Sequence, residues 1–262
     1  MTHPTSLVRG RALITGGSSG LGLEFARQLA ARGLDLVLVA RDAERLARAA
    51  QELRGSGVSV ETLPADLSDD DGVAAVAQRL GSLQSPVDVF VNNAGAGLYA
   101  KMATADASEL VAGAELMGIT PMVLGGAAAA AMKERGRGVI INTSSMSGAA
   151  PMGAYSAIKA FVRVWSDSLA IEVAPFGVQV VTFIPGWVRT EFHARTGVST
   201  SSIPDFLWLD AQRVVAECLA DADRGRTSST PSKRFKLIGF LAKHAPAGAV
   251  AVAVKKLNKG RR

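Results

Sequence analysis

The 262-residue chain has little cysteine, few aromatic residues and no long uncharged apolar run. Its one cysteine, Cys218, excludes an internal disulfide, so we expect a reducing compartment. The N-terminal segment lacks the apolar core of a signal peptide, and no apolar run reaches the ~18–20 residues of a membrane span. His, Cys and acidic residues show no metal-ligand spacing. These absences favour a cytoplasmic globular domain without a metal site.

Acidic residues are missing from the last part of the chain. The net charge is +6, yet Arg224 to Arg262 carries eleven Lys or Arg and no Asp or Glu, which leaves residues 1–223 at −5. We expect a catalytic domain over residues 1–232 and a basic amphipathic extension over residues 233–262.

Apolar residues of this extension recur at helical spacing, at Phe235, Ile238 and Leu241. The apolar stripe can pack on its own body, on a partner subunit, or on an anionic membrane that also attracts the cations. A nucleic-acid partner is disfavoured, because the cations are interleaved with aliphatic rather than aromatic side chains.

Apolar runs of strand length alternate with helical patterns along most of the chain. The expected strands cover residues 11–17, 34–41, 58–66, 87–95, 136–145 and 178–186, and the expected helices cover 21–33, 42–57, 106–135 and 155–177. Continuous apolar strands separated by helices are typical of a parallel sheet covered on both faces. We predict an α/β fold with a single doubly wound, mostly parallel sheet of the Rossmann type. Ligands then bind at the carboxyl ends of the strands.

A glycine-rich turn joins the first expected strand to the first helix. Gly16, Gly20 and Gly22 give the pattern T-G-x-x-x-G-x-G. Glycine permits a tight turn and a close approach to a pyrophosphate, and the helix N-terminus supplies free N–H groups. The turn lacks the Gly-Lys-Ser/Thr ending of an ATP-binding loop. It therefore indicates a dinucleotide site.

The end of the second strand indicates which dinucleotide binds. A cofactor with a free ribose 2′-hydroxyl usually meets an acidic residue here, whereas this chain has Ala40 and Arg41. Because an arginine pairs with a 2′-phosphate through charge-assisted hydrogen bonds, we favour NADP(H) over NAD(H).

Tyr155 and Lys159 stand four residues apart in an expected helix and so share one of its faces. A proton donor beside a cation is one interpretation of the pair, and chance is another, because the spacing alone is common.

Five motifs occur in a fixed order: "TGGSSGLG", "NNAG" at 92–95, "SS" at 144–145, "YSAIK" at 155–159 and "PGWVRT" at 185–190. With them the chain resembles a classical short-chain dehydrogenase/reductase (SDR). The stretches "VRTEFH" and "FLWLDAQRVVAE" also resemble a DltE-like bacterial subgroup. The resemblance implies an NADP(H)-dependent oxidoreductase that interconverts a carbonyl and an alcohol.

The resemblance also implies a role for each motif residue. Tyr155 is the expected general acid or base, with Lys159 lowering its pKa through a nearby charge. A serine orients the carbonyl, with Ser145 preferred over Ser144. The expected cofactor contacts come from Gly16, Ser18, Ser19, Leu21, Arg41, Asp66, Leu67, Asn92, Ala94, Tyr155, Lys159, Pro185, Gly186, Val188 and Thr190.

Two departures from the family pattern leave an alternative open. Met117 stands where the family usually has an asparagine that holds a relay water, and the loop between Ser145 and Tyr155 is shorter than in relatives. The alternative is an NADP(H)-binding protein with little or no turnover.

The segment after "PGWVRT" is expected to contact the substrate. Ile203, Phe206, Leu207 and Trp208 form either an apolar lid for a hydrophobic substrate or part of the core. His193 is expected on the surface or in the substrate loop. The family implies a homodimer or homotetramer, and the basic extension adds peripheral contact with an anionic inner membrane surface as one hypothesis.

Overall fold

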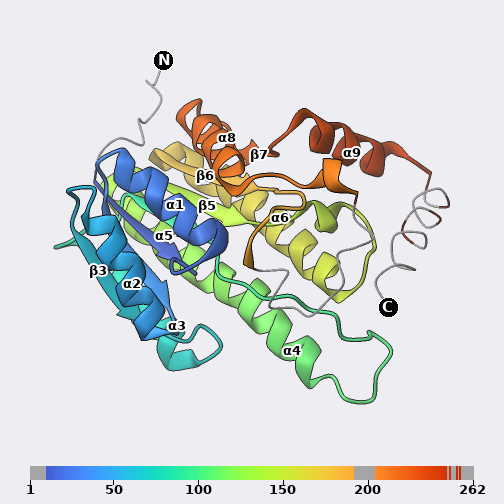
Figure 1. Ribbon diagram of the computed structural model, residues 1–262, viewed down its shortest axis with the longest axis horizontal. Coiled ribbons are helices and arrows are strands. Elements are labelled where there is room, and N and C mark those ends of the chain that lie inside the picture. Colours follow the sequence, from blue (N-terminus) through green and yellow to red (C-terminus); the bar gives the residue numbers. More distant parts are fainter. Residues whose placement is uncertain (1–9, 192–203, 247, 249–251, 253, 255–262) are drawn as a thin grey trace.

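Seven strands among the described residues form one parallel sheet, in the order β3-β2-β1-β4-β5-β6-β7 (Figure 1). The computed structural model describes residues 10–191, 204–246, 248, 252 and 254. The strands are β1 (Arg11–Thr15), β2 (Asp35–Ala40), β3 (Val60–Pro64), β4 (Val89–Asn92), β5 (Gly138–Thr143), β6 (Val178–Phe183) and β7 (Ser228–Ser229). The strand order reverses between β1 and β4, and this reversal opens a crevice at the carboxyl ends of the strands.

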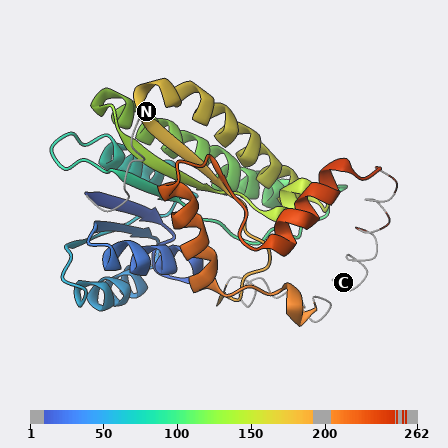
Figure 2. The same cartoon turned by 90° about the horizontal axis from the view of Figure 1, so that it is seen from above.

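Helices cover both faces of the sheet (Figures 1 and 2). Apolar residues of α1, α2 and α8 pack on one face, and those of α3, α5 and α6 pack on the other. The helical segments are α1 (Gly20–Ala31), α2 (Ala43–Arg54), α3 (Asp70–Leu80), α4 (Ser108–Ala114), η1 (Glu115–Ile119), α5 (Thr120–Arg135), η2 (Met146–Ala149), α6 (Ala154–Val173), η3 (Ala174–Phe176), η4 (Asp205–Leu207), α8 (Ala211–Asp223) and α9 (Lys233–His244).

The predicted doubly wound parallel sheet is therefore confirmed. The predicted strands and helices all occur, with ends displaced by a few residues. The two-residue β7 was not predicted, because "SS" carries no apolar run. It pairs with Thr182 and Phe183 of β6 and extends the sheet by one strand.

One described helix is long and apolar enough to cross a membrane by length and composition, with a mean hydropathy of 1.5. It runs from Ser108 to Arg135 through α4, η1 and α5. Its uncharged part, from Leu116 to Met132, is shorter than the ~18–20 residues that the sequence expectation required of a membrane span. Leu124, Ala128 and Met132 of this helix are buried in the apolar layer between the sheet and the helices α3, α5 and α6. One side of this helix therefore packs on the sheet, and 33% of its most apolar window is buried.

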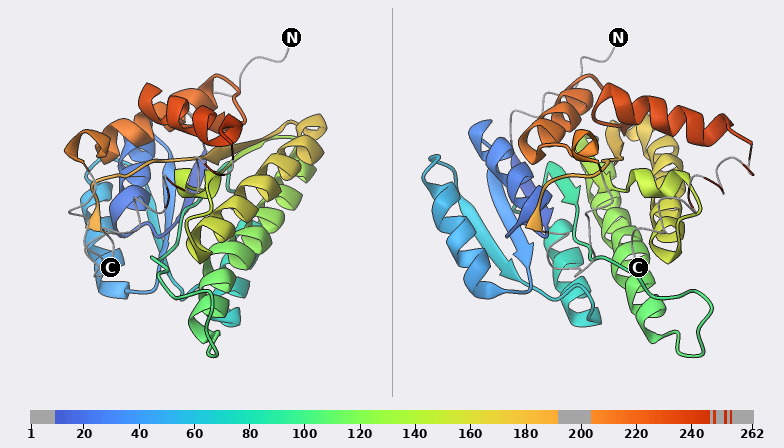
Figure 3. Two further views of the ribbon diagram at one scale, coloured as in Figure 1. Left: turned by 90° about the vertical axis from the view of Figure 1, so that its right-hand side faces the viewer. Right: turned by 45° about the vertical axis from the view of Figure 1, so that its right-hand side comes forward.

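Helix α9 lies beside α8 along one side of the molecule (Figure 3). Phe235, in its first turn, is 1% exposed and belongs to the core cluster. Its ring contacts Trp187 at 5.8 Å between centroids and covers Gly186 closely. The expected helix in the basic extension is therefore present, and it packs against the loop that follows β6.

Candidate active site

The glycine-rich turn is built to approach a phosphate closely. Gly16 has a φ of 67°, a conformation that favours glycine. A Cβ on Gly22 would lie 2.2 Å from the carbonyl oxygen of Gly16, so only glycine fits there. Ser19 precedes α1 and its side chain makes no capping hydrogen bond. The first N–H groups of α1, with the positive end of the helix dipole, are thus suited to an anion.

The neighbouring edge of the sheet carries the next predicted residues. Arg41 follows β2 and is exposed. Asp66 follows β3, and its carboxylate accepts hydrogen bonds from the backbone and hydroxyl of Ser68 at 3.0 and 2.6 Å. These bonds lower the pKa of Asp66, and the charge of Arg41 lowers it further. Arg41 and Asp66 therefore lie near each other, while Leu67 is buried.

The "NNAG" segment is fastened to the glycine turn by Thr15. The Thr15 hydroxyl accepts from the backbone N–H groups of Asn93 and Ala94 at 2.9 and 3.0 Å. Asn92 is directed elsewhere, and its amide donates to the carbonyl of Pro121 at 2.8 Å. The contribution of Thr15 and Asn93 was missed, because it depends on contacts between separate strands.

Ser145, Tyr155 and Lys159 meet where β5 ends. The Ser145 hydroxyl accepts the N–H of Ser147 at 3.1 Å and lies close enough to the phenol of Tyr155 to lower its pKa. The Ser144 hydroxyl is buried and donates instead to the carbonyl of Lys159 at 2.7 Å. Lys159 is 4% exposed, its Nζ donates to the carbonyl of Thr143 at 3.0 Å, and it lies 5.8 Å from the centroid of the Tyr155 ring.

Burial sets the acidity of this group of side chains. It raises the pKa of Tyr155 to about 12, against the opposing hydrogen bond from Ser145, and the nearby Tyr99 raises it further. Burial lowers the pKa of Lys159 to about 8. Lys159 was expected to lower the pKa of Tyr155; that pKa is instead raised, and its largest cause is desolvation by burial. Tyr99 is a neighbour that no motif indicated.

The segment after β6 passes between these two parts of the site. The carbonyl of Pro185 accepts from the N–H of Met146, the residue after Ser145, at 2.9 Å. Val188 is buried and pairs with Leu209. Thr190 lies against the glycine turn, because a Cβ on Gly20 would be 3.6 Å from the Cβ of Thr190. The segment thus joins the glycine turn to the Ser145 loop.

Comparison with known proteins agrees with this geometry. A sequence model described as short chain dehydrogenase matches residues 11–199. The chain belongs to the short-chain dehydrogenase family. It is an oxidoreductase of the NAD(P)-dependent class that acts on CH–OH and C=O groups.

Three known proteins illustrate the range of this dehydrogenase family. A galactitol 2-dehydrogenase (L-tagatose-forming) from Cereibacter sphaeroides is 38% identical over 69% of this chain and 72% of its own. A very-long-chain 3-oxoacyl-CoA reductase from Podospora anserina is 36% identical over 68% of this chain and 55% of its own. The structure of a short-chain dehydrogenase from Sphingobium yanoikuyae in complex with NADPH is 33% identical over 97% of both chains, with a TM-score of 0.81.

Met117, the residue at the family's asparagine position, lies in the π-helical turn η1. Its sulfur accepts the N–H of Ala96 at 3.4 Å, and the residue is 1% exposed. It therefore packs against the segment that follows "NNAG". A thioether is a weak acceptor and has no donor, so the side chain offers little to an ordered water.

The segments expected to contact substrate are only partly described. Phe206 is 63% exposed, while Trp208 is partly buried with the Arg189 guanidinium 5.4 Å from its ring centroid. Leu207 packs against the core at its edge. Ile203 and His193 lie outside the described residues.

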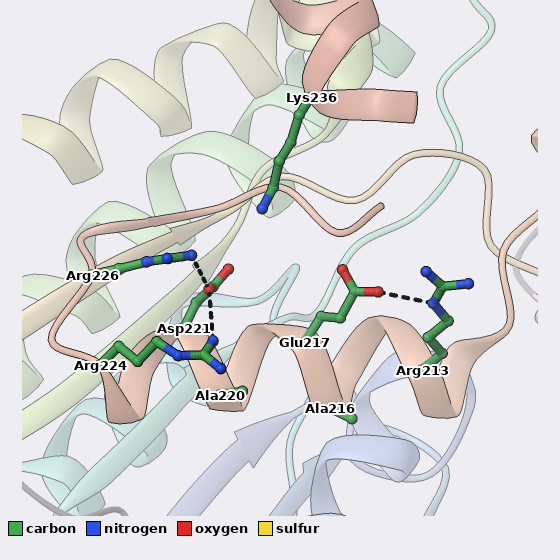
Figure 4. A pocket seen from close by; sticks show the side chains of 8 residues that line it. All are labelled: Arg213, Ala216, Glu217, Ala220, Asp221, Arg224, Arg226 and Lys236. Carbon is green, nitrogen blue, oxygen red and sulfur yellow. Dashed lines mark hydrogen bonds and ion pairs between the residues drawn. The ribbon is translucent and has the colours of Figure 1, made fainter. Parts of the chain in front are cut away.

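A shallow groove of about 350 Å³ separates α8 from α9 (Figure 4). Arg224 and Arg226 both pair with Asp221, whose side chain is 7% exposed, and Arg213 pairs with Glu217 at 2.9 Å. Two cations of the acid-free stretch from Arg224 to Arg262 are thus paired with an acid that precedes it. None of the predicted site residues lines this groove. Within the described part of the chain, no cluster of His, Cys, Asp and Glu is suited to a metal ion.

Proposed function

We propose that this dehydrogenase is an NADP(H)-dependent enzyme that interconverts a carbonyl and an alcohol on a hydrophobic substrate. The observation that carries the proposal is that the Ser145 hydroxyl lies beside the Tyr155 phenol, with the ammonium of the buried Lys159 5.8 Å from the centroid of the same ring. A DltE-like subgroup remains our prediction for its place within the family.

Tyr155 is the proposed general acid for carbonyl reduction and the base for alcohol oxidation. With a pKa of about 12 the phenol is protonated at neutral pH, which favours reduction under those conditions. Ser145 donates a hydrogen bond to the substrate oxygen, and Lys159 supplies positive charge beside the phenol as its proton leaves. The bound nicotinamide supplies or accepts the hydride.

The proposed cofactor site follows the carboxyl edge of the sheet. The N–H groups at the start of α1 hold the pyrophosphate, and the tightly packed glycines leave room for it. Arg41 contacts the 2′-phosphate, while Asp66 and Leu67 flank the adenine. The remaining predicted contacts come from Ser18, Ser19, Leu21, Asn92, Ala94, Lys159, Pro185, Gly186, Val188 and Thr190.

A hydrophobic substrate is proposed from the exposed apolar side chains beside the site. Phe206 and the α9 residues Leu237, Phe240 and Leu241 are each more than half exposed. Gly239 of α9 lies against Met146, next to Ser145, so the helix that carries this apolar surface adjoins the catalytic loop through its opposite face. A relative that reduces very-long-chain 3-oxoacyl-CoA is compatible with such a substrate, although another relative acts on a sugar alcohol.

The second candidate function is cofactor binding with little or no turnover. Met117 favours it, because its sulfur takes a backbone N–H where the family usually has an asparagine. A panel of hydrophobic ketones, 3-oxoacyl thioesters and sugar alcohols, followed at the nicotinamide absorbance with NADPH or NADP⁺, separates the two. Turnover of a hydrophobic ketone supports the first candidate. NADPH binding without turnover across the panel supports the second.

We further propose that the enzyme is cytoplasmic and homo-oligomeric, a dimer or tetramer. Ile119, Phe161, Val164 and Ile171 on η1 and α6 are 41–78% exposed, an apolar surface that a second copy would cover. Light scattering coupled to size exclusion tests this, and a monomer at micromolar concentration would contradict it. The division into residues 1–232 and 233–262 remains a prediction.

Peripheral contact with an anionic membrane is proposed for α9. Its exposed Leu237, Phe240 and Leu241 accompany the cations Lys233 and Lys236, a combination suited to a lipid interface. Because Phe235 is buried, truncation after Ser232 would also damage the core. Phe240→Ser is the better variant, and it should reduce co-sedimentation with anionic vesicles at low salt. Wild-type protein that stays in the supernatant contradicts the proposal.

A further inference from the structure

A salt bridge joins the two halves of the fold beside the predicted cofactor site. Arg45 Nη2 lies 2.6 Å from Glu191 Oε2, although the residues are 146 positions apart. Arg45 is in the first turn of α2, where Asp42 caps the helix by accepting the Arg45 N–H at 2.9 Å. Glu191 directly follows Thr190 in the segment after β6.

The bridge crosses the carboxyl edge of the sheet over the glycine turn. Thr190 touches the turn near Gly20, so its neighbour Glu191 extends from there toward α2. Arg45 is four residues after Arg41, the residue proposed for the 2′-phosphate, and Asp42, the cap of α2, stands between them. Both arginines therefore belong to the segment that joins β2 to the first turn of α2.

Both arginines have an acidic neighbour at this edge. Arg41 is close enough to Asp66 to lower the pKa of that carboxylate. The Arg45 side chain is 33% exposed and that of Glu191 is 58% exposed. An ion pair this accessible to water stabilises a protein little. A phosphate offers more negative charge and more acceptor oxygens to a guanidinium than a carboxylate does, and it is the stronger partner for Arg45.

We propose that Arg45 is a second cation for the 2′-phosphate of the cofactor and that Glu191 competes with that phosphate for it. Glu191 thereby reduces the preference for NADPH over NADH and couples cofactor binding to the segment that leads into the substrate region. This inference rests on the proposed function, because it requires that the chain bind a nicotinamide dinucleotide.

Titration of NADPH and NADH against four variants tests the proposal. Arg45→Gln should lower the affinity for NADPH roughly tenfold, the scale of a charge-assisted hydrogen bond, and leave the affinity for NADH nearly unchanged. Glu191→Gln should raise the affinity for NADPH about two- to fivefold, the scale of a released surface ion pair. The affinity for NADH should again be unchanged. The double variant should match Arg45→Gln alone.

Glu44→Gln is the matched control, because Glu44 forms an ion pair with Arg48 on the same helix. It should change neither affinity. Far-ultraviolet circular dichroism and urea midpoints check that every variant folds. The exposure of all the substituted side chains makes unfolding unexpected.

Three results would overturn the inference. If Glu191→Gln changes the affinities for NADPH and NADH equally, the Arg45–Glu191 bridge only holds the two segments together and does not compete with the 2′-phosphate. If wild type prefers NADPH but Arg45→Gln keeps the same preference, Arg45 does not contact the phosphate, and the proposed function survives. If wild type binds neither dinucleotide, the inference and the proposed function fail together.

Discussion

Replacement of the buried Lys159 by methionine should stabilise the protein at neutral pH. Lys159 is 4% exposed and donates to the carbonyl of Thr143. Burial lowers its pKa from the ordinary 10.5 to about 8. The charged form of Lys159 is therefore less favourable in the folded protein than in the unfolded chain. Its ammonium lowers the free energy of unfolding at neutral pH. Methionine fills a similar volume without the charge.

The pKa gives both the size and the pH dependence of this effect. Between about pH 8 and 10.5 the unfolded chain binds more protons than the folded one, so wild-type stability rises with pH across that window. The difference between the two pKa values is worth about 3 kcal/mol, at 1.36 kcal/mol per pH unit. Lys159→Met should therefore gain up to that amount at pH 7, and much less near pH 10.5. Tyr155 is common to both proteins, and its raised pKa affects both alike.

Urea unfolding of wild type and Lys159→Met, from pH 6 to 10.5, measures the difference. Lys101→Met is the control, because Lys101 is exposed and its substitution should change stability little at any pH. A variant that is less stable than wild type at pH 7, or a difference that does not change with pH, would refute the reasoning. Activity should fall in the same variant, which is the expected trade between stability and function.

Three further predictions use single substitutions, two of them with a matched control. Ser145→Ala should reduce turnover by ~10²-fold or more, as for a lost oxyanion donor. Ser144→Ala should mainly lower the free energy of unfolding by ~1–3 kcal/mol, because a buried hydrogen bond is lost. Steady-state kinetics and urea unfolding distinguish the two variants. Arg41→Ala should lower the affinity for NADPH roughly tenfold in a binding titration. An equal loss of affinity for NADH would contradict the proposed contact of Arg41 with the 2′-phosphate. Gly186→Ala should destabilise by ~1–3 kcal/mol, because the new Cβ would lie within 2.5 Å of an aromatic ring. Gly126→Ala, with nothing within 4 Å, should be neutral or slightly stabilising by thermal denaturation.

The sheet was predictable because its signal is local. Continuous apolar runs such as residues 36–39 of β2 are buried on both faces, and the sequence alone carries that pattern. The glycine turn was predictable for the same reason, because its spacing reports backbone geometry directly. β7 was not, because two serines pair with β6 only once the rest of the sheet exists.

Properties of the site that depend on distant residues were not predictable. The pKa of Tyr155 is set by burial from several elements, and the proximity of Lys159 in sequence gave the wrong sign. The choice between Ser144 and Ser145 depends on which hydroxyl faces α6 and which faces the phenol. The Arg45–Glu191 bridge joins residues that no local pattern connects.

The central claim is that Tyr155 transfers the proton in a nicotinamide-dependent reduction. The most direct measurement compares wild type, Tyr155→Phe and Tyr99→Phe for NADPH affinity and for turnover of the best ketone found in the substrate panel. Tyr155→Phe should bind NADPH as wild type does and lose at least ~10²-fold in turnover, while Tyr99→Phe, the chain's other tyrosine, should retain most of it. Near-wild-type turnover by Tyr155→Phe would contradict the account.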